Sequence, residues 1–219
     1  MTATDSVENY LKTIYVLEAR SQVTTTLIAG HLHVASPSVS AMVKKLVAEG
    51  LVRHAPYQEV RLTRQGQAAA RRVVRRHRLI ETYLHEALGI PWDEVHDEAE
   101  VLEHCVSDRV EDAMDSALGH PSRDPHGDPI PPKKGRHDEV ADEPLASIQP
   151  GTTVRLERVS DRDPAVLRHL AGLAVLPGIE LVVEARDPFG GPTWVRAGGQ
   201  RHPLGSELVG AMFVSVVSR

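Results

Sequence analysis

The 219-residue chain contains one cysteine, Cys105, and so has no partner for a disulfide within the chain. It also has no apolar run of the length needed to cross a bilayer. Its first residues, MTATDSVENYLK, lack both the basic and the apolar regions of a secretory signal peptide. These absences argue against secreted and membrane-spanning classes, and we expect a protein of the reducing cytoplasm.

The net charge of −5 is not distributed evenly along the chain. Ten Lys or Arg residues lie between Met42 and Arg78, against two acidic residues. Ten Asp or Glu residues lie between Trp92 and Asp115, against one Arg. A basic segment followed by an acidic one suggests a polyanion-binding module joined to a cation-binding module. The alternative is two solvated helix faces of opposite charge.

The first half of the chain has the apolar periodicity of several amphipathic helices. The pattern predicts helices over 5–20, 24–34, 36–49 and 64–88, and one further helix over 92–118. A threonine at the start of the second helix and Gly50 after the third are typical of helix ends. Residues 51–63 alternate on either side of Pro56–Tyr57–Gln58, as a small hairpin does.

Two short helices followed by a hairpin predict a winged helix-turn-helix that binds double-stranded DNA. The second of these helices, 36–49, would enter the major groove and the hairpin would contact flanking phosphates. The residues expected at DNA are Ser36, Pro37, Ser38, Ser40, Lys44, Arg53 and Arg61. Two alternatives remain, since Ser36 also suits a helix cap and helix-turn-helix pairs also serve as protein-docking modules.

A stripe of metal-ligand side chains is the most informative feature of the acidic segment. His96, Glu100, Glu103 and His104 lie at offsets of 0, 4, 7 and 8, which project from one side of a helix. His77 and Glu81 form a second such pair on the preceding helix. Imidazoles and carboxylates avoid burial unless they are paired or bind a metal, so two such helices packed together predict a divalent-cation site. Cys105 lies one residue off the stripe and is expected to be a buried apolar residue rather than a ligand.

The last part of the chain has a different amino-acid composition. Residues 120–145 are rich in Pro, Gly and charge, which indicates a partly ordered loop that leads into a linker. From Pro150 the segments TVRLERV, IELVVEA and AMFVSVV predict short strands, with a short helix in PAVLRHLAGL. About five strands in this length suggest a small SH3-like barrel.

The order of these motifs resembles the diphtheria-toxin-repressor family of iron- and manganese-dependent transcriptional regulators. The resemblance is carried by the winged helix, then HRLIE, VHDEAEVLEHCVSD and RDPHGDPIP, and it covers essentially the whole chain. It implies an α+β protein with a winged helix-turn-helix domain over 1–63 and a helical dimerisation and metal-binding domain over 64–132. A linker over 133–149 and an SH3-like β-barrel over 150–219 would follow.

By the same resemblance the protein is a homodimeric repressor with two metal sites in each chain. One site would hold His77, Glu81 and His96, and the other Glu100, Glu103 and His104. Two further ligands are expected, each from another part of the chain. Asn9 stands at the position of helix 1 that supplies a ligand in the family, and Asp163 (or Asp161) would come from the third domain.

The residue at position 100 bears on metal choice. The iron-responsive members carry cysteine where this chain has Glu100, whereas the manganese-responsive members carry glutamate there. A carboxylate favours Mn(II), while a thiolate favours softer ions. The resemblance therefore implies a manganese-responsive repressor of metal-homeostasis genes, with Fe(II), Co(II) and Zn(II) as alternative ions. Lys12 replaces a glutamate of the shorter manganese regulators, which argues against their paired-metal arrangement.

Two other functions remain open at this stage. An iron- or zinc-responsive regulator of the same fold would differ only in its metal. A di-iron carboxylate enzyme would also place Glu and His on paired helices, but such enzymes use a Glu-x-x-His motif on each of two helices. This chain offers no second motif of that kind, and its winged helix would then have no use.

Overall fold

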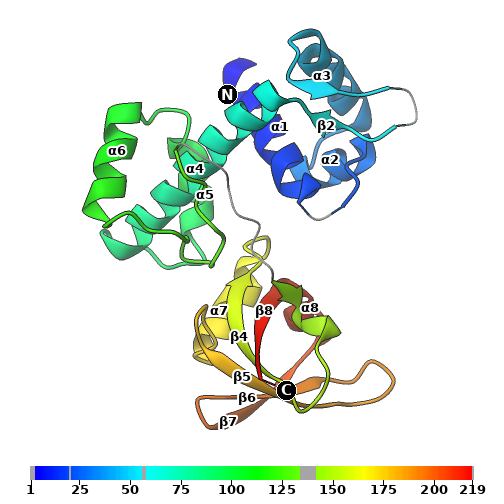
Figure 1. The fold of residues 1–219 in the computed structure, drawn as a ribbon, viewed down its shortest axis with the longest axis vertical. Coiled ribbons are helices and arrows are strands. Elements are labelled where there is room, and N and C mark those ends of the chain that lie inside the picture. Colours follow the sequence, from blue (N-terminus) through cyan, green and yellow to red (C-terminus); the bar gives the residue numbers. More distant parts are fainter. Residues whose placement is uncertain (1–2, 20, 56–57, 134–141, 219) are drawn as a thin grey trace. The chain divides into compact units, whose positions relative to one another are not determined.

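The computed structural model describes residues 3–19, 21–55, 58–133 and 142–218. These residues form two compact units, 1–77 and 78–219, which meet within one continuous helix (Figure 1). The predicted α+β class is confirmed. None of the described helices is both long and apolar enough to cross a membrane.

The first unit is a three-helix bundle with a short two-stranded hairpin. Its elements are α1 Ala3–Glu18, α2 Thr25–Leu32, α3 Ser36–Ala48, β1 Val52–Arg53, β2 Arg61–Leu62 and the first half of α4 Arg64–Glu86. The three helices share one apolar core, in which Ile14, Ile28 and Leu46 are fully buried. The predicted hairpin is confirmed, with Val52 opposite Leu62, while Pro56 and Tyr57 at its tip lie outside the described residues.

The N-caps differ between the two helices that are predicted to bind DNA. The side chain of Thr24 accepts a hydrogen bond from the Leu27 amide at 3.1 Å, so α2 begins where the sequence predicts. The N-cap of α3 is Ala35, and no side chain caps it. The expectation that Ser36 caps this helix is therefore wrong, because Ser36 and Pro37 already lie in the first turn.

The prediction of a single helix over 92–118 is also wrong. The structure has two helices there, α5 Val95–Leu102 and α6 Asp108–Ala117. Val106 donates its amide hydrogen to the Leu102 carbonyl, and the side chain of Ser107 accepts from the Val110 amide and so caps α6. The chain therefore turns immediately after the first half of the predicted ligand stripe.

The β part of the second unit is a six-stranded antiparallel sheet of the SH3-like kind, in the order β3-β8-β4-β5-β6-β7. Its elements are β3 Glu143–Pro144, η1 Leu145–Ser147, β4 Thr153–Val159, α7 Pro164–Gly172, β5 Glu180–Arg186, β6 Thr193–Ala197, β7 Gln200–Leu204, α8 Ser206–Ala211 and β8 Met212–Ser218. Helices α7 and α8 contribute to the core of the sheet through Leu167, Leu170 and Val209. Within the predicted linker, 133–149, the structure has β3 and η1, and Leu145 is fully buried, while 134–141 lie outside the described residues.

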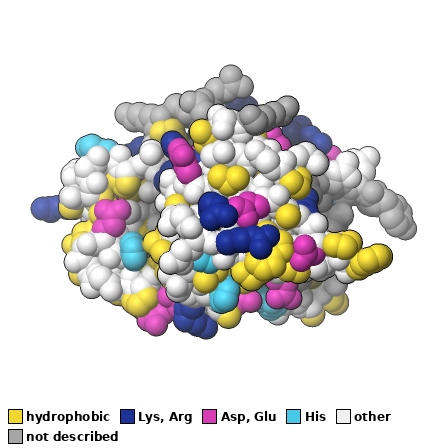
Figure 2. Space-filling model, turned by 90° about the horizontal axis from the view of Figure 1, so that it is seen from below, with side chains coloured by type: hydrophobic (Ala, Val, Ile, Leu, Met, Phe, Trp, Pro, Cys, Tyr) yellow, Lys and Arg dark blue, Asp and Glu magenta, His cyan; other side chains and the backbone are white. Residues whose placement is uncertain are grey.

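The outer side of β5–β7 carries paired charges next to an aromatic ring. Glu184 accepts hydrogen bonds from Arg196 at 2.6 Å and from Arg201 at 2.8 Å. The Arg201 guanidinium also lies 3.9 Å from the centre of the Trp194 ring. Figure 2, which views the molecule from below, shows basic, acidic and hydrophobic side chains intermixed. Charge on this side is thus balanced by pairing and is not gathered in one sign.

Candidate metal centre

Helix α4 supplies the first two candidate ligands. Its buried residues Ala70, Val74, His77 and Glu81 follow one another at intervals of four, three and four, so they form one stripe. The stripe is apolar in its first half and polar in its second, where His77 is 5% exposed and Glu81 is 1% exposed. A carboxylate this deeply buried needs a cationic partner.

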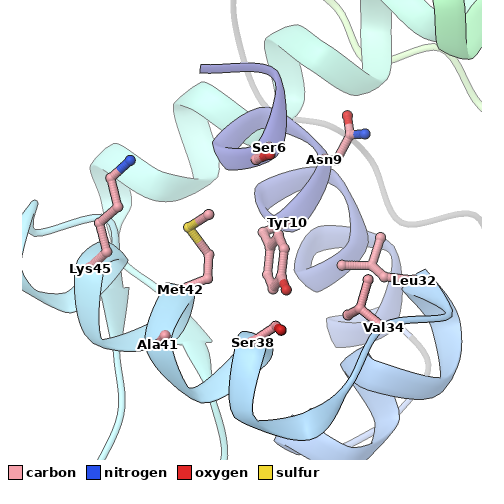
Figure 3. Close-up of a pocket in the computed structure, with 9 residues that line it drawn as sticks. All are labelled: Ser6, Asn9, Tyr10, Leu32, Val34, Ser38, Ala41, Met42 and Lys45. Carbon is pink, nitrogen blue, oxygen red and sulfur yellow. The ribbon is translucent and has the colours of Figure 1, made fainter. Parts of the chain in front are cut away.

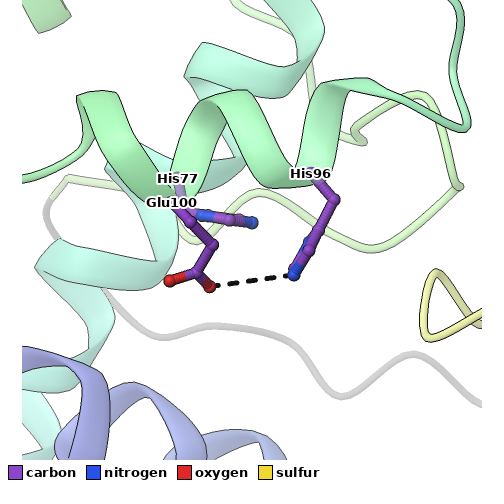
Figure 4. Close-up of side chains that lie close together, drawn as sticks. All are labelled: His77, His96 and Glu100. Carbon is purple, nitrogen blue, oxygen red and sulfur yellow. Dashed lines mark ion pairs between the residues drawn. The ribbon is translucent and has the colours of Figure 1, made fainter.

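Helix α5 places two more candidate ligands beside this stripe. Val95 and Ala99 of α5 are fully buried in a small core, while His96 and Glu100 project from an adjacent side of the helix. His96 Nδ1 lies 3.2 Å from Glu81 Oε1, and His96 Nε2 lies 3.7 Å from Glu100 Oε1. His77, His96 and Glu100 offer ligand atoms within 4.8 Å of one another (Figure 4). His77 ends the first unit, but α4 carries it on the same helix as Glu81.

The segment that follows β4 supplies a third part of the candidate site. Asp161 lies two residues beyond this strand, and its Oδ2 is 3.1 Å from His96 Nδ1. Glu81, His96 and Asp161 form a second group of atoms within 4.8 Å of one another. Asp163, the residue expected from this region, instead accepts a hydrogen bond from the Ala165 amide at 2.8 Å as the N-cap of α7. The structure therefore places Asp161 at the cluster, and Asp163 at a helix end.

The 122–130 loop, in which no ligand was predicted, adds a third group, formed by Glu81, Asp124 and His126, all of them buried. The His126 ring stacks on Trp92 with 5.8 Å between ring centres, and His126 Nε2 lies 2.6 Å from the Trp92 carbonyl oxygen. Since a carbonyl only accepts, Nε2 carries the hydrogen, and in a neutral ring Nδ1 is then the acceptor. Nδ1 is buried without a hydrogen-bond partner and lies 4.0 Å from Glu81 Oε1.

This loop is held against the end of β4. Val159 donates its amide hydrogen to the His126 carbonyl at 2.8 Å, and Arg123 pairs with Glu157 at 3.0 Å. Gly127 has φ +89°, and a Cβ there would come within 2.0 Å of the Glu157 carbonyl oxygen. The motif RDPHGDPIP could have signalled these residues, because a His and two Asp lie close to a glycine in it. Only the fold shows that this segment meets α4.

Protons balance the charge of the cluster when no cation is bound. Burial lowers the pKa of His96, but hydrogen bonds to Asp161 and Glu81 outweigh burial and raise it to about 11. Burial likewise raises the pKa of Asp161, yet the His96 partner brings it below its usual range. The pKa of Asp124 is raised well above its usual value, first by burial and then by the Glu81 and Asp128 carboxylates. A divalent cation would replace these protons.

The remaining predicted ligands lie around the break after α5. Glu103 is the C-cap of α5 and is 1% exposed, and its Oε1 lies 3.6 Å from His104 Nε2. The resemblance grouped these two residues with Glu100, whereas the structure groups Glu100 with His77 and His96. Asn9 lies in the first unit on α1, and its side-chain oxygen is buried without a hydrogen-bond partner. Cys105 is exposed, so the expectation that it is buried is wrong.

These residues fit a divalent cation. The orphaned Nδ1 of His126 and the orphaned oxygen of Asn9 are buried acceptors, which cost free energy unless a donor or a cation satisfies them. The three groups offer only carboxylate oxygens and imidazole nitrogens. Such ligands suit Mn(II) and Fe(II) among first-row metals, and no thiolate contributes within the described clusters.

The candidate DNA-binding residues lie on the surface of the first unit. Ser36, Pro37, Ser38, Ser40, Lys44, Arg53 and Arg61 are all exposed. Arg53 and Arg61 are directly opposite in the β1–β2 ladder, so both side chains emerge on one side of the hairpin. Arg61 is paired with Glu59 at 2.5 Å, and this exposed pair would have to open for Arg61 to reach a phosphate. Ser40 donates to the Ser36 carbonyl at 3.1 Å.

A cavity of about 560 Å³ lies between α1 and α3 in the same unit. It is lined by Ser6, Asn9, Tyr10, Leu32, Val34, Ser38, Ala41, Met42 and Lys45. Figure 3 shows Tyr10 and Met42 facing one another across it, while the Asn9 amide points away from its centre. The side-chain oxygen of Asn9 is therefore directed elsewhere than into this cavity.

Comparison with known protein families divides the chain into three matched segments. Residues 2–60 match the model described as iron dependent repressor, N-terminal DNA binding domain. Residues 63–132 match that of the iron dependent repressor, metal binding and dimerisation domain. Residues 143–216 match the FeoA domain.

Individual relatives agree with these matches. The iron-dependent repressor IdeR of Mycobacterium tuberculosis is 33% identical over 226 residues, which cover 97% of this chain and 98% of that protein. A solved structure described as a manganese-dependent transcriptional repressor in complex with manganese has a TM-score of 0.91 at 40% identity, covering 96% of this chain and all of the other. The manganese regulator SloR has a TM-score of 0.80 at 33% identity, with 96% and 98% coverage.

Proposed function

Because this chain belongs to the iron-dependent repressor family of metal-dependent transcriptional repressors, we propose that it is a manganese-responsive repressor that binds operator DNA as a homodimer. The family is one of DNA-binding repressors, so the chain is not the di-iron enzyme that its Glu and His residues also suggested. Its place of action would be the cytoplasm, where operator DNA is found.

The chemistry of the donor set carries the choice of manganese. Every group of candidate ligands combines histidine nitrogen with carboxylate oxygen, and position 100 holds a glutamate. Mn(II) accepts hard oxygen ligands, whereas thiolates favour softer ions. The solved relatives named as manganese-dependent repressors are consistent with this proposal.

We propose that the metal is held around Glu81, which belongs to two of the three groups. The ligands that we assign to this centre are His77, Glu81, His96, Glu100, Asp124, His126 and Asp161. The resemblance implies a second site of Glu100, Glu103 and His104; with Glu100 assigned to the first centre, Glu103 and His104 would remain for the second. Asn9 stays a predicted ligand on α1. A bound cation supplies positive charge among these carboxylates and so ties α4, α5 and the end of β4 together.

The DNA-binding residues would act as in other winged helices. Helix α3 would enter the major groove with Ser38 and Ser40 near the bases, while Lys44 and the hairpin residues Arg53 and Arg61 contact phosphates. The segment 63–132 would supply the dimer interface, in keeping with the description of its family model. Domain limits at 63, 132 and 149 remain a proposal beside the two compact units of the structure.

An iron-responsive repressor is the second candidate. The relative IdeR is described as an iron-dependent repressor, and the same nitrogen and oxygen ligands also bind Fe(II). Zinc is a weaker candidate, although one solved relative, ScaR, is described with bound Zn²⁺.

The test is a DNA-binding titration of the metal-free protein on its own promoter with Mn(II), Fe(II), Co(II) and Zn(II). We expect Mn(II) at micromolar concentration to activate DNA binding, with the others weaker or inactive. Activation by Fe(II) under anaerobic conditions without activation by Mn(II) would assign the protein to iron. A protein that binds the promoter equally well with a chelator present would contradict metal control altogether.

A further inference from the structure

Helix α1 brings a cation to one of the candidate ligands. Lys12 Nζ lies 3.4 Å from Nδ1 of His77, and both residues belong to the first unit. His77 is 5% exposed, while Lys12 is partly buried along α1. The contact is therefore shielded from bulk water, and its chemistry constrains what else His77 can do.

An ammonium group can donate hydrogen bonds but cannot accept them, so Nδ1 of His77 must be the acceptor. A neutral imidazole has one nitrogen with a hydrogen and one with a lone pair. The contact with Lys12 therefore fixes the hydrogen on Nε2 and occupies the only lone pair of the ring. A doubly protonated ring would have no acceptor for Lys12 at all.

A metal ion also needs this lone pair. If the ion binds Nδ1, the Lys12 ammonium must leave that atom. If the ion binds Nε2, the hydrogen must move to Nδ1, and Nδ1 can then no longer accept from Lys12. Binding of a cation through either nitrogen of His77 and the hydrogen bond from Lys12 are thus mutually exclusive.

We propose that Lys12 is an internal competitor of the metal at His77 and that it raises the concentration of metal needed to load this ligand. The inference rests on the proposed function for the identity of His77 as a ligand. Two effects act in the same direction, because the ammonium occupies the lone pair and its positive charge repels a divalent ion. Metal binding then removes the hydrogen bond from Lys12 to His77.

Loss of the Lys12–His77 contact would affect α1, the helix that is also bonded to the hairpin. Asn9 and Lys12 lie three residues apart on α1 and so share one side of it. At the end of the same helix, Glu18 accepts a hydrogen bond from the Leu62 amide of β2 at 2.7 Å. Metal at His77 thus removes one of the contacts that hold α1, a helix that is itself bonded to the hairpin.

The test compares the full-length wild type with Lys12→Met, which keeps the aliphatic stem and removes the charge and the donor. Lys45→Met on α3 is the matched control, because it removes one exposed lysine charge from the same unit. We expect Lys12→Met to bind Mn(II) about tenfold more tightly in calorimetric titration, the size expected for one charge-assisted hydrogen bond. Lys45→Met should bind as the wild type does.

A second measurement needs no metal and has its main readout in the wild type. Nitrogen-15 NMR of histidine-labelled, metal-free wild type reports which ring nitrogen carries the hydrogen, and the His77 signals are identified by their loss in His77→Gln. We expect the Nε2–H form for His77 in wild type and a mixture of forms in Lys12→Met. The Nδ1–H form in wild type, or equal Mn(II) affinities of wild type and Lys12→Met, would overturn the proposal. Absence of any Mn(II) binding by wild type would instead overturn the proposed function together with it.

Discussion

Glu100 is the residue at which a single side chain bears on the choice of metal. Its carboxylate lies 3.7 Å from His96 Nε2 on α5, within the cluster. Glu100→Cys would put a thiolate there, and we expect DNA-binding activation to shift from Mn(II) towards Fe(II) or Co(II). Glu98→Cys is the control, since Glu98 is exposed on the same helix and is not in the candidate clusters. An unchanged metal ranking in Glu100→Cys would refute the selectivity argument.

Asp161 is a candidate ligand, whereas Asp163 is the N-cap of α7. Asp161→Asn removes a charged oxygen 3.1 Å from His96, and we expect the Mn(II) affinity to fall by at least about tenfold. Asp163→Asn keeps an N-cap acceptor for α7, so it should change neither metal affinity nor melting temperature appreciably. Calorimetric titration of both variants checks this. A larger loss of metal affinity in Asp163→Asn than in Asp161→Asn would indicate that Asp163 is the ligand.

His96 gives metal binding a pH dependence. Its pKa of about 11 means that it is protonated near neutral pH, whereas a histidine that ligates a metal must be neutral. Each bound ion should therefore release a proton from His96, and the apparent affinity should rise with pH, by up to about tenfold per unit. Calorimetry in buffers of different ionisation enthalpy measures the proton count. A count that is the same in wild type and His96→Asn would contradict this origin of the proton.

At the scale of elements, the cluster depends on how closely the 122–130 loop approaches β4. Gly127→Ala would place a Cβ within 2.0 Å of the Glu157 carbonyl oxygen, at a positive φ. We expect the loop to detach, with loss of the His126 and Asp124 contributions and weaker Mn(II) binding. Gly119→Ala is the control, because Gly119 also has a positive φ but no atom within 4 Å of an added Cβ. Similar metal affinities for the two variants would show that the loop is not part of the centre.

How much of this arrangement could be predicted depended on the range of the interactions. Local periodicity was enough for α1 to α4 and for the strands β4, β5 and β8. It failed after Leu102, because the apolar pattern continues through a turn that the Ser107 cap creates. It also could not choose between Asp161 and Asp163, since that choice depends on where β4 ends relative to His96. Long-range packing brought His126 to Glu81, which no pattern within one segment reports.

At the scale of the whole molecule, α4 joins the two functions. Ala70 belongs to the apolar core of the DNA-binding unit, while His77 and Glu81 lie two and three turns further along the same helix among the candidate ligands. A cation that stabilises one position of this helix therefore also acts on the element that supports the winged helix. Under the proposed function, the metal would shift the population between two forms of one dimer, and no new interface would be required.

Thermodynamic linkage allows the coupling between metal and DNA to be measured from either ligand. If Mn(II) raises the affinity for operator DNA by some factor, operator DNA must raise the affinity for Mn(II) by the same factor. A coupling of about 1–3 kcal/mol, common for allosteric proteins, corresponds to roughly 5–150-fold. The measurement is a calorimetric titration of Mn(II) into the protein with and without its operator, and a DNA titration with and without Mn(II). A scrambled duplex of equal length is the control for electrostatic binding, since phosphate contacts alone do not depend on sequence. Equal Mn(II) affinities with operator and with scrambled DNA would mean that the metal does not select the DNA-binding form, whichever ion fills the site.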